Sequence, residues 1–430
     1  MPQNSRDLTD QLFSKILTTE LIPALGCTEP IAVALAASKA GEVLGRLPEK
    51  VELQCSGNII KNVKGVIVPN SGGRTGLEIA AAMGFASGQS DKGLEVLEGL
   101  TPEHLKIAIN LVERDVIRVK VAVGEESLYV RVRARAEADE VEVVLEKSHN
   151  HIASIKKNGV VLYKDVPVAT FSIELDKSIL SMAAILDFSR TVDFNLHPEL
   201  SKVLDQQIKW NTAIADEGLS GHWGAEVGKT ILQSSQPEDT AARAKARPAA
   251  GSDARMNGCS LPVVINSGSG NQGMTVSLPV IEYARDLNAS HDALHRALIV
   301  SNLTSIYQKN YIGRLSAFCG AVSAAAGAGA GIAFLKGMDD ATIGMIVTNT
   351  IATIGGMVCD GAKRSCAAKI AMAVETALMG IRMAEQGYSF NFGEGIVGET
   401  VDGTIKNVGR MAKDGMRETD IEILHIMTED

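Results

Sequence analysis

The sequence pattern changes character along this chain of 430 residues, and that change limits the folds it can adopt. Alternating or β-branched runs, which are typical of strands, are confined to residues 51–163. From residue 178 to residue 430 such runs are almost absent, and Ala- and Gly-rich helical patterns take their place. We therefore expect an α+β fold with a sheet-containing domain and a large all-α domain.

The strand-like part predicts a mostly antiparallel sheet, because short turns join several of its runs. We predict strands at residues 51–56, 64–69, 116–123, 128–136, 141–147 and 160–163, helices at 75–87 and 102–114, and loops at 234–251 and 388–398. The expected domains are N-terminal helices packed on the helical domain (1–50), an α+β domain (51–175) and an all-α domain (176–430).

Charge and hydropathy restrict the partners of the chain. A formal net charge of −9 argues against a nucleic-acid partner, which needs a basic surface. The uncharged stretches 315–335 and 341–359 are long enough to cross a membrane. They are rich in Gly, Ala, Ser and Thr, and the mean hydropathy of the chain is only +0.09, so we expect buried helices and no membrane partner. A homodimer is compatible with long buried helices, but no sequence feature requires one.

The first residues are polar and no apolar run follows them, which predicts a cytoplasmic protein. In a reducing compartment, cysteines are more often free, metal-bound or catalytic than disulfide-linked. The six cysteines of this chain are therefore the first candidates for chemistry.

Cys319, Cys359 and Cys366 cluster in the last third of the sequence. Nearby glycines predict a break before a helix, with Cys359 at or before its first residue and Cys366 one to two turns inside. The spacing is not that of a zinc ribbon or a ferredoxin, so by itself it fits buried free thiols as well as cluster ligands. We interpret Cys55 and Cys259 as bystanders.

Cys27 lies near the start of the chain in the string Gly-Cys-Thr-Glu-Pro. Pro30 fits the first turn of a helix, where its missing N–H costs nothing. A thiol at that helix N-terminus is expected to have a lowered pKa.

Polar, glycine-rich segments supply further candidates. Arg255 and the loop 266–273 could receive a carboxylate, and the glycine turn at 68–76 could bind an anion at a helix N-terminus, although both could equally be ordinary turns. His149 and His151 are two residues apart at a predicted strand end, so they would share a face and either act in proton transfer or lie on the surface.

Several strings of this sequence together resemble the L-cysteine desulfidase family, the UPF0597 group, whose C-terminal half is related to the α chain of iron–sulfur L-serine dehydratases. They are residues 26–30, 217–221, 252–256, 266–273, 315–319, 359–362 and 365–367. The resemblance implies an oxygen-sensitive [4Fe–4S] cluster held by Cys319, Cys359 and Cys366. It also implies conversion of L-cysteine to pyruvate, ammonia and sulfide without pyridoxal phosphate.

With that resemblance, Cys27 becomes the candidate base, or the group that caps the open iron at rest, and Glu29 a second catalytic candidate. The expected residues for binding a small L-amino acid are Asn70, Ser71, His149, Arg255, Ser267, Ser269, Asn271 and Gln272. The sequence leaves three alternatives open: an L-serine dehydratase, a non-catalytic iron–sulfur redox sensor, and a structural or binding protein with ordinary core thiols.

Overall fold

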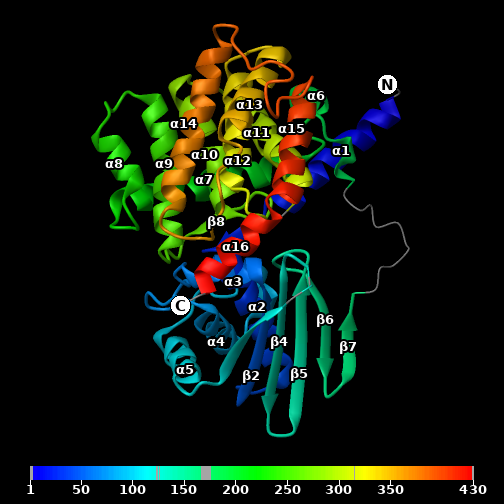
Figure 1. The fold of residues 1–430 in the computed structure, drawn as a ribbon, viewed down its shortest axis with the longest axis vertical. Coiled ribbons are helices and arrows are strands. Elements are labelled where there is room, and N and C mark those ends of the chain that lie inside the picture. Colours follow the sequence, from blue (N-terminus) through cyan, green and yellow to red (C-terminus); the bar gives the residue numbers. More distant parts are fainter. Residues whose placement is uncertain (1–2, 123, 125, 166–175, 314, 429–430) are drawn as a thin grey trace.

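The structure is a computed structural model that describes residues 3–122, 124, 126–165, 176–313 and 315–428 (Figure 1). A six-stranded sheet with covering helices forms one end of the molecule, and a bundle of helices forms the other. The predicted α+β fold is confirmed. The domain boundary predicted at residue 175 lies outside the described residues.

The sheet has the strand order β3-β2-β4-β5-β6-β7. Its strands are β2 (Lys50–Ser56), β3 (Ile117–Ala122), β4 (Tyr129–Ala136), β5 (Asp139–Glu146), β6 (Ile152–Lys157) and β7 (Val160–Lys164). Only the β2–β3 pair is parallel among the described strands, so the prediction of a mostly antiparallel sheet is confirmed. The strand predicted at 64–69 is wrong. Its buried valines follow the helix α3 (Gly57–Lys64), and only Ile67 forms a bridge, to Thr75.

Side chains of β4 show how the sheet is covered on one face. Val130, Val132 and Ala134 are buried, and they alternate with arginines that are half-buried or exposed. The helix α2 (Thr28–Leu44) packs over this buried face together with α4 (Leu77–Ser87). The helix α5 (Pro102–Glu113) packs on α4. On the other face the arginines pair with glutamates, such as Arg133 with Glu142 at 2.8 Å.

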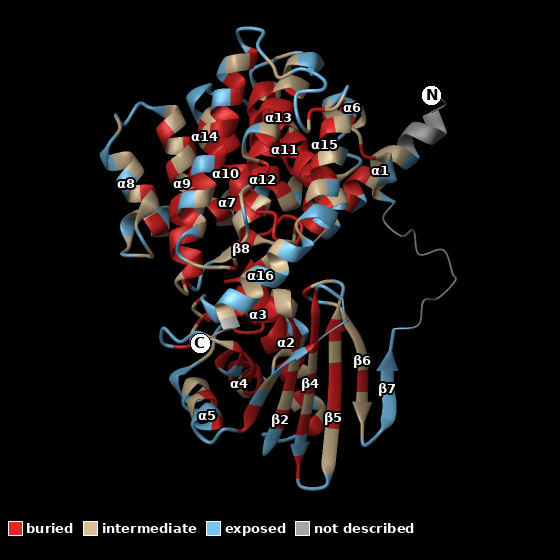
Figure 2. Cartoon of the chain, viewed as in Figure 1, coloured by how far each residue is buried: buried red, intermediate tan, exposed pale blue. Residues whose placement is uncertain are grey.

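The bundle is built from helices rich in small residues. It comprises α6 (Met182–Thr191), α7 (Pro198–Ser220), α8 (Val227–Gln233), α9 (Thr240–Met256), α10 (Gly270–Asp286), α11 (His291–Ile312), α12 (Gly320–Leu335), α13 (Asp340–Ile354), α14 (Cys366–Ala384) and α15 (Val401–Arg410). Figure 2 shows that buried residues concentrate where these helices face one another. Glycines allow the close crossings: a Cβ added to Gly327 of α12 would lie 2.4 Å from the carbonyl oxygen of Ser301.

Two predictions for the bundle are confirmed and one is wrong. The uncharged stretches form the buried helices α12 and α13, and residues 388–398 form a loop. Within the described residues, no helix combines the length and the apolar character needed to cross a bilayer. The loop predicted at 234–251 is instead mostly helix α9, because alanines dominate it and the Asp239 carboxylate caps its N-terminus by accepting from the Ala242 N–H.

Elements near both ends of the chain connect the helical bundle with the sheet-containing part. The helix α1 (Gln3–Glu20) packs on the bundle, whereas α2 packs on the sheet and not on the helical domain predicted for residues 1–50. Between them, β1 (Pro23–Leu25) pairs with β8 (Pro262–Val264) of the bundle. At the other end, α16 (Arg417–Thr428) lies on α3 (Figure 1). Most of the candidate residues named above meet at this junction.

Candidate functional site

A cavity of about 100 Å³ lies at the junction of the bundle and the sheet-containing part. Most candidate residues predicted from the sequence line it, although they come from distant parts of the chain. They are Cys27, Glu29, His149, Arg255, Ser267, Ser269, Asn271, Gln272, Cys319, Cys359 and Cys366.

Four helix N-termini converge on this cavity. Cys27 is the N-cap of α2, Ser269 that of α10 and Cys319 that of α12, while Cys366 is the first residue of α14. Free backbone N–H groups and the helix dipole make each such end favourable for an anion. The cavity is therefore suited to thiolates and to a carboxylate.

The backbone fixes Cys319 and Cys359 relative to each other. An isolated antiparallel bridge joins Phe318 to Val358, and on its flanks the Cys319 N–H donates to the Met357 carbonyl at 3.0 Å. The Cys359 N–H donates to the carbonyl two residues before Cys319, at 2.6 Å. Because side chains alternate along such a pair, both thiols lie on the same face.

Cys366 completes this group of thiols at the start of α14. The predicted position of Cys359 before the helix is confirmed, but Cys366 opens the helix rather than lying one to two turns inside. The intervening turn is longer than the glycine pattern suggested, because Gly361 adopts a φ of +97° and its backbone packs against the Lys61 carbonyl.

The three thiols are suited to holding a metal cluster. Burial, and then the neighbouring Cys359 and Cys366, raise the pKa of Cys319 to about 12, so without a metal this thiol stays protonated. A coordinated thiol is deprotonated outright, and iron–sulfur clusters take thiolate ligands. The N-termini of α12 and α14 compensate the resulting negative charge. The donor set and its setting therefore fit an iron–sulfur cluster.

Beside these thiols, Glu29 connects groups from three elements. Its Oε2 accepts a hydrogen bond from the Cys27 thiol at 3.0 Å and from the Thr28 hydroxyl at 3.1 Å. Its Oε1 accepts from Asn62 at 3.3 Å and lies 3.5 Å from Nε2 of His149. Cys27 and Glu29 are thus held as a pair at the cavity wall.

The pKa values of Glu29 and Cys27 are shifted in opposite directions. Burial by itself raises the pKa of Glu29, but His149, Cys27 and Arg255 together outweigh it and lower that pKa to about 2. Burial and the Glu29 charge raise the pKa of the Cys27 thiol well above its usual value. The lowered pKa predicted for Cys27 is therefore wrong for the protein alone, because desolvation and an adjacent carboxylate outweigh the helix N-terminus.

Arg255 and the loop after β8 form the opposite side of the cavity. Arg255 is only 2% exposed; its Nη1 donates to Asn271 at 3.0 Å, while its Nε has no hydrogen-bond partner among the described residues. Gln272 also presents a buried Oε1 to which no described residue donates a hydrogen bond. Gly270 is required here, because an added Cβ would lie 2.4 Å from Nε of Arg255. A bound ligand with a carboxylate and an ammonium group could satisfy both unpaired atoms.

Not every predicted residue reaches the cavity. The side chain of Asn70 bonds to the Leu97 carbonyl and to Ser260, and Ser71 bonds within its own turn to Arg74. Neither lines the cavity.

The two histidines do not share a face as predicted, because they lie in the turn between β5 and β6 rather than in a strand. His149 is buried beside Glu29, whereas Nε2 of His151 contacts Asp165 at 2.9 Å.

Asn62 and Lys309 are among the lining residues that were not predicted from the sequence. Asn62 lies in α3 among other polar residues such as Asn58 and Lys61, so nothing in the local sequence set it apart. Lys309 also lines the cavity from α11. Lys309 is the one lysine of the α11 segment and has uncharged neighbours, which was a sequence signal that could have identified it. In the structure this side chain is only 7% exposed.

Comparison with known proteins identifies one matching family model and several relatives that cover nearly the whole chain. Residues 91–425 match the family model of the serine dehydratase alpha chain. A UPF0597 protein of Lachnoclostridium phytofermentans is 50% identical over 412 residues, covering 96% of this chain and 98% of that protein. UPF0597 proteins of Finegoldia magna and Treponema denticola are 44% and 42% identical, each covering 97% of this chain and 99% and 98% of their own lengths.

Proposed function

This chain belongs to the serine dehydratase alpha chain family, and on that premise we propose that it is an iron–sulfur-dependent lyase that needs no pyridoxal phosphate. The proposed reaction converts L-cysteine and water to pyruvate, ammonia and hydrogen sulfide. The observation that supports it most is that three thiols, the Cys27–Glu29 pair and Arg255 line one cavity.

Cys319, Cys359 and Cys366 would hold the [4Fe–4S] cluster. When bound, such a cluster supplies a Lewis-acidic iron that polarises the substrate. The fit of the donor set supports this assignment, since Cys319 caps the N-terminus of α12 and Cys366 is the first residue of α14.

The substrate's charged ends have partners in this chain. We assign the carboxylate to Arg255 and the N-terminus of α10, which attract an anion through a guanidinium and free N–H groups. Oε1 of Gln272 is a buried acceptor that no group in the described part of the chain satisfies, and it suits the ammonium group.

The elimination removes the α-proton and breaks the bond between the β-carbon and sulfur, and the resulting enamine tautomerises and hydrolyses to pyruvate and ammonia. We assign the proton transfer to Cys27. Its thiol is protonated at rest, because burial raises its pKa, so the proton must leave before Cys27 can act as a base. Glu29 has the lowered pKa of the pair, so it orients the thiol by accepting its hydrogen bond at 3.0 Å and does not take its proton, while Asn62 positions Glu29. We assign the thiol proton to the departing sulfur, which leaves as hydrogen sulfide, and the α-proton then restores the Cys27 thiol.

A second candidate function is L-serine dehydration, which the description of the matching family favours. The same groups would serve, with hydroxide rather than sulfide as the leaving group. The two substrates differ mainly in the size and softness of one atom.

The test is anaerobic reconstitution of the full-length chain, followed by iron and sulfide analysis and by pyruvate release from L-cysteine and from L-serine. We expect a cluster and a higher kcat/KM for L-cysteine. A higher kcat/KM for L-serine would show that L-serine, and not L-cysteine, is the preferred substrate. A cluster without pyruvate from either amino acid would indicate a redox protein, and absence of iron would indicate ordinary core thiols.

Matched variants separate the roles of the thiols. Cys359→Ser should lose iron, whereas Cys259→Ser should keep it, because Cys259 is buried but does not line the cavity. Cys27→Ala should keep the cluster and lose turnover. Full turnover of Cys27→Ala with an intact cluster would eliminate Cys27 as the base.

We also propose a cytoplasmic location, which the six free cysteines support. The proposed partner is a small L-amino acid; we propose neither nucleic acid nor a membrane as a partner. A homodimer stays a prediction that light scattering can test.

A further inference from the structure

A second group of metal-ligating side chains lies outside the cavity. Among the described residues, Asp205, His291 and His295 form the one group of at least three His, Cys, Asp or Glu side chains whose donor atoms all lie within 4.8 Å of one another. Asp205 belongs to α7, and both histidines belong to α11. We propose that these residues bind a divalent transition-metal ion of the zinc type.

The helix places the two imidazoles together. His291 is the first residue of α11 and His295 follows one turn later, so both rings lie on the same helix face, with their centroids 4.0 Å apart. Both Nε2 atoms contact the same oxygen of Asp205, at 2.8 and 2.9 Å. Three potential ligands from two helices thus converge on one point.

The donor set matches the chemistry of zinc. Two imidazoles and one carboxylate are common ligands of Zn²⁺ and of similar ions, with metal–ligand distances of about 2.1 Å. A tetrahedral ion at those distances separates its ligand atoms by about 3.4 Å. The contacts to Asp205 at 2.8 and 2.9 Å therefore need to widen by only about half an ångström, which side-chain rotation provides.

The surroundings orient one ligand and leave the ion accessible. The side chain of His295 is 2% exposed, and the ring of Phe194 packs edge-on against it with centroids 5.6 Å apart. Burial lowers the pKa of His295, which favours the neutral form that binds metals. The side chains of His291 and Asp205 are 67% and 52% exposed, so an ion can enter and water can complete its coordination.

An ion at this position would strengthen an existing contact between helices. Two turns further along α11, Asn302 exchanges two hydrogen bonds with Gln207 of α7, at 2.9 and 3.1 Å. The ion would add a second link between the same helices. Because the unfolded chain lacks the site, binding should raise the melting temperature.

The test uses cobalt(II) as a spectroscopic probe for zinc, with the full-length reduced chain under anaerobic conditions. Cavity thiols also bind cobalt, so the informative quantity is the difference between the wild type and His291→Gln. We expect the wild type to bind one more ion per chain, with a difference spectrum that lacks sulfur-to-cobalt charge transfer. Zinc should raise the melting temperature of the wild type more than that of the variant.

Two further variants complete the design. Asp205→Asn should reproduce the loss, and, since both changed side chains are more than half exposed, folding should be unaffected. His222→Gln is the control, because His222 is also exposed and pairs one turn away with Glu226. Equal cobalt binding by the wild type, His291→Gln and Asp205→Asn, or a difference spectrum with sulfur charge transfer, would overturn the proposal.

Discussion

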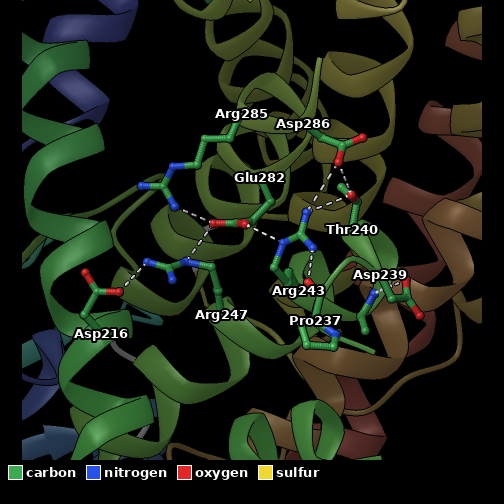
Figure 3. A network of polar contacts seen from close by, with 10 residues as sticks. Asp216, Pro237, Asp239, Thr240, Arg243, Arg247, Glu282, Arg285 and Asp286 are labelled. Carbon is green, nitrogen blue, oxygen red and sulfur yellow. Dashed lines mark hydrogen bonds and ion pairs between the residues drawn. The ribbon is translucent and has the colours of Figure 1, made fainter. Parts of the chain in front are cut away.

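The carboxylate of Glu282 on α10 is the centre of a charge network that holds α9 and α10 together, and its removal gives a sharp test of the role of burial (Figure 3). Its side chain is only 4% exposed, and three arginines surround it: Arg285 at 2.6 Å, Arg247 at 2.9 Å and Arg243 at 3.3 Å. Glu282→Gln keeps the shape of the side chain and removes its charge.

The expected loss of stability depends on the partners that the three arginines retain in the Glu282→Gln variant. Breaking a buried ion pair by removing one partner costs about 3–5 kcal/mol, because the other charge stays desolvated. Here Arg247 retains Asp216 at 2.6 Å, Arg243 retains Thr240 at 2.8 Å, and Arg285 is half exposed. We therefore expect the lower end, a loss of about 3 kcal/mol in the free energy of unfolding.

Glu375 on α14 is a matched control. It also pairs with two basic side chains, Lys245 at 2.6 Å and Arg382 at 2.7 Å, but it is 35% exposed. Water already screens such a pair, so Glu375→Gln should cost less than about 1 kcal/mol.

Thermal unfolding followed by circular dichroism measures both variants. An unfolding entropy of about 2.1 cal/mol/K per residue gives about 0.9 kcal/mol/K for 430 residues, so Glu282→Gln should lower Tm by about 3 °C. Glu375→Gln should lower it by less than about 1 °C. Equal shifts for the two variants would refute the reasoning, since burial would then not decide the cost.

Three further changes test other parts of the structure. The pKa of Glu29 is lowered to about 2, so its contribution to stability is present above its unfolded pKa near 4.5 and is lost as the pH falls toward 2. Urea unfolding at several pH values should show the stability difference between the wild type and Glu29→Gln shrinking by about 3 kcal/mol over that range, and a constant difference would contradict the lowered pKa. Gly218→Ala would bring a Cβ to 2.0 Å from a carbonyl oxygen of α9 and should cost about 2 kcal/mol or more in the same assay, whereas Gly356→Ala meets no atom within 4 Å and should be neutral. Asp420→Asn removes the carboxylate that pairs with the buried Lys61, so amide exchange in α16 should accelerate markedly; an unchanged rate would show that this ion pair does not dock the helix.

The fold was predictable where pattern and environment agree. In β4 the buried valines alternate with arginines, and this repeat of two residues identified the strand from the sequence. The buried valines at 66 and 68 look the same in sequence, yet no strand of the described ranges pairs with them. The bundle helix α9 was predicted as a loop, although its alanines favour helix and its position against α7 and α10 buries it. Hydrogen-bond partners and burial come from the rest of the chain, and local pattern does not specify them.

For the candidate site, the sequence by itself determined which groups are available: a thiol before Glu29, a cluster of cysteines in the last third, Arg255 and a polar glycine-rich loop. Only the tertiary structure decided that they line one cavity, that Asn70 and Ser71 stay outside it, and that Asn62 and Lys309 belong to it. It also decided the protonation of Cys27, since burial and an adjacent carboxylate outweigh the helix end that favours a thiolate. The physical reason is that reactivity depends on desolvation and on charges a few ångströms away, and those neighbours come from segments far apart in the sequence.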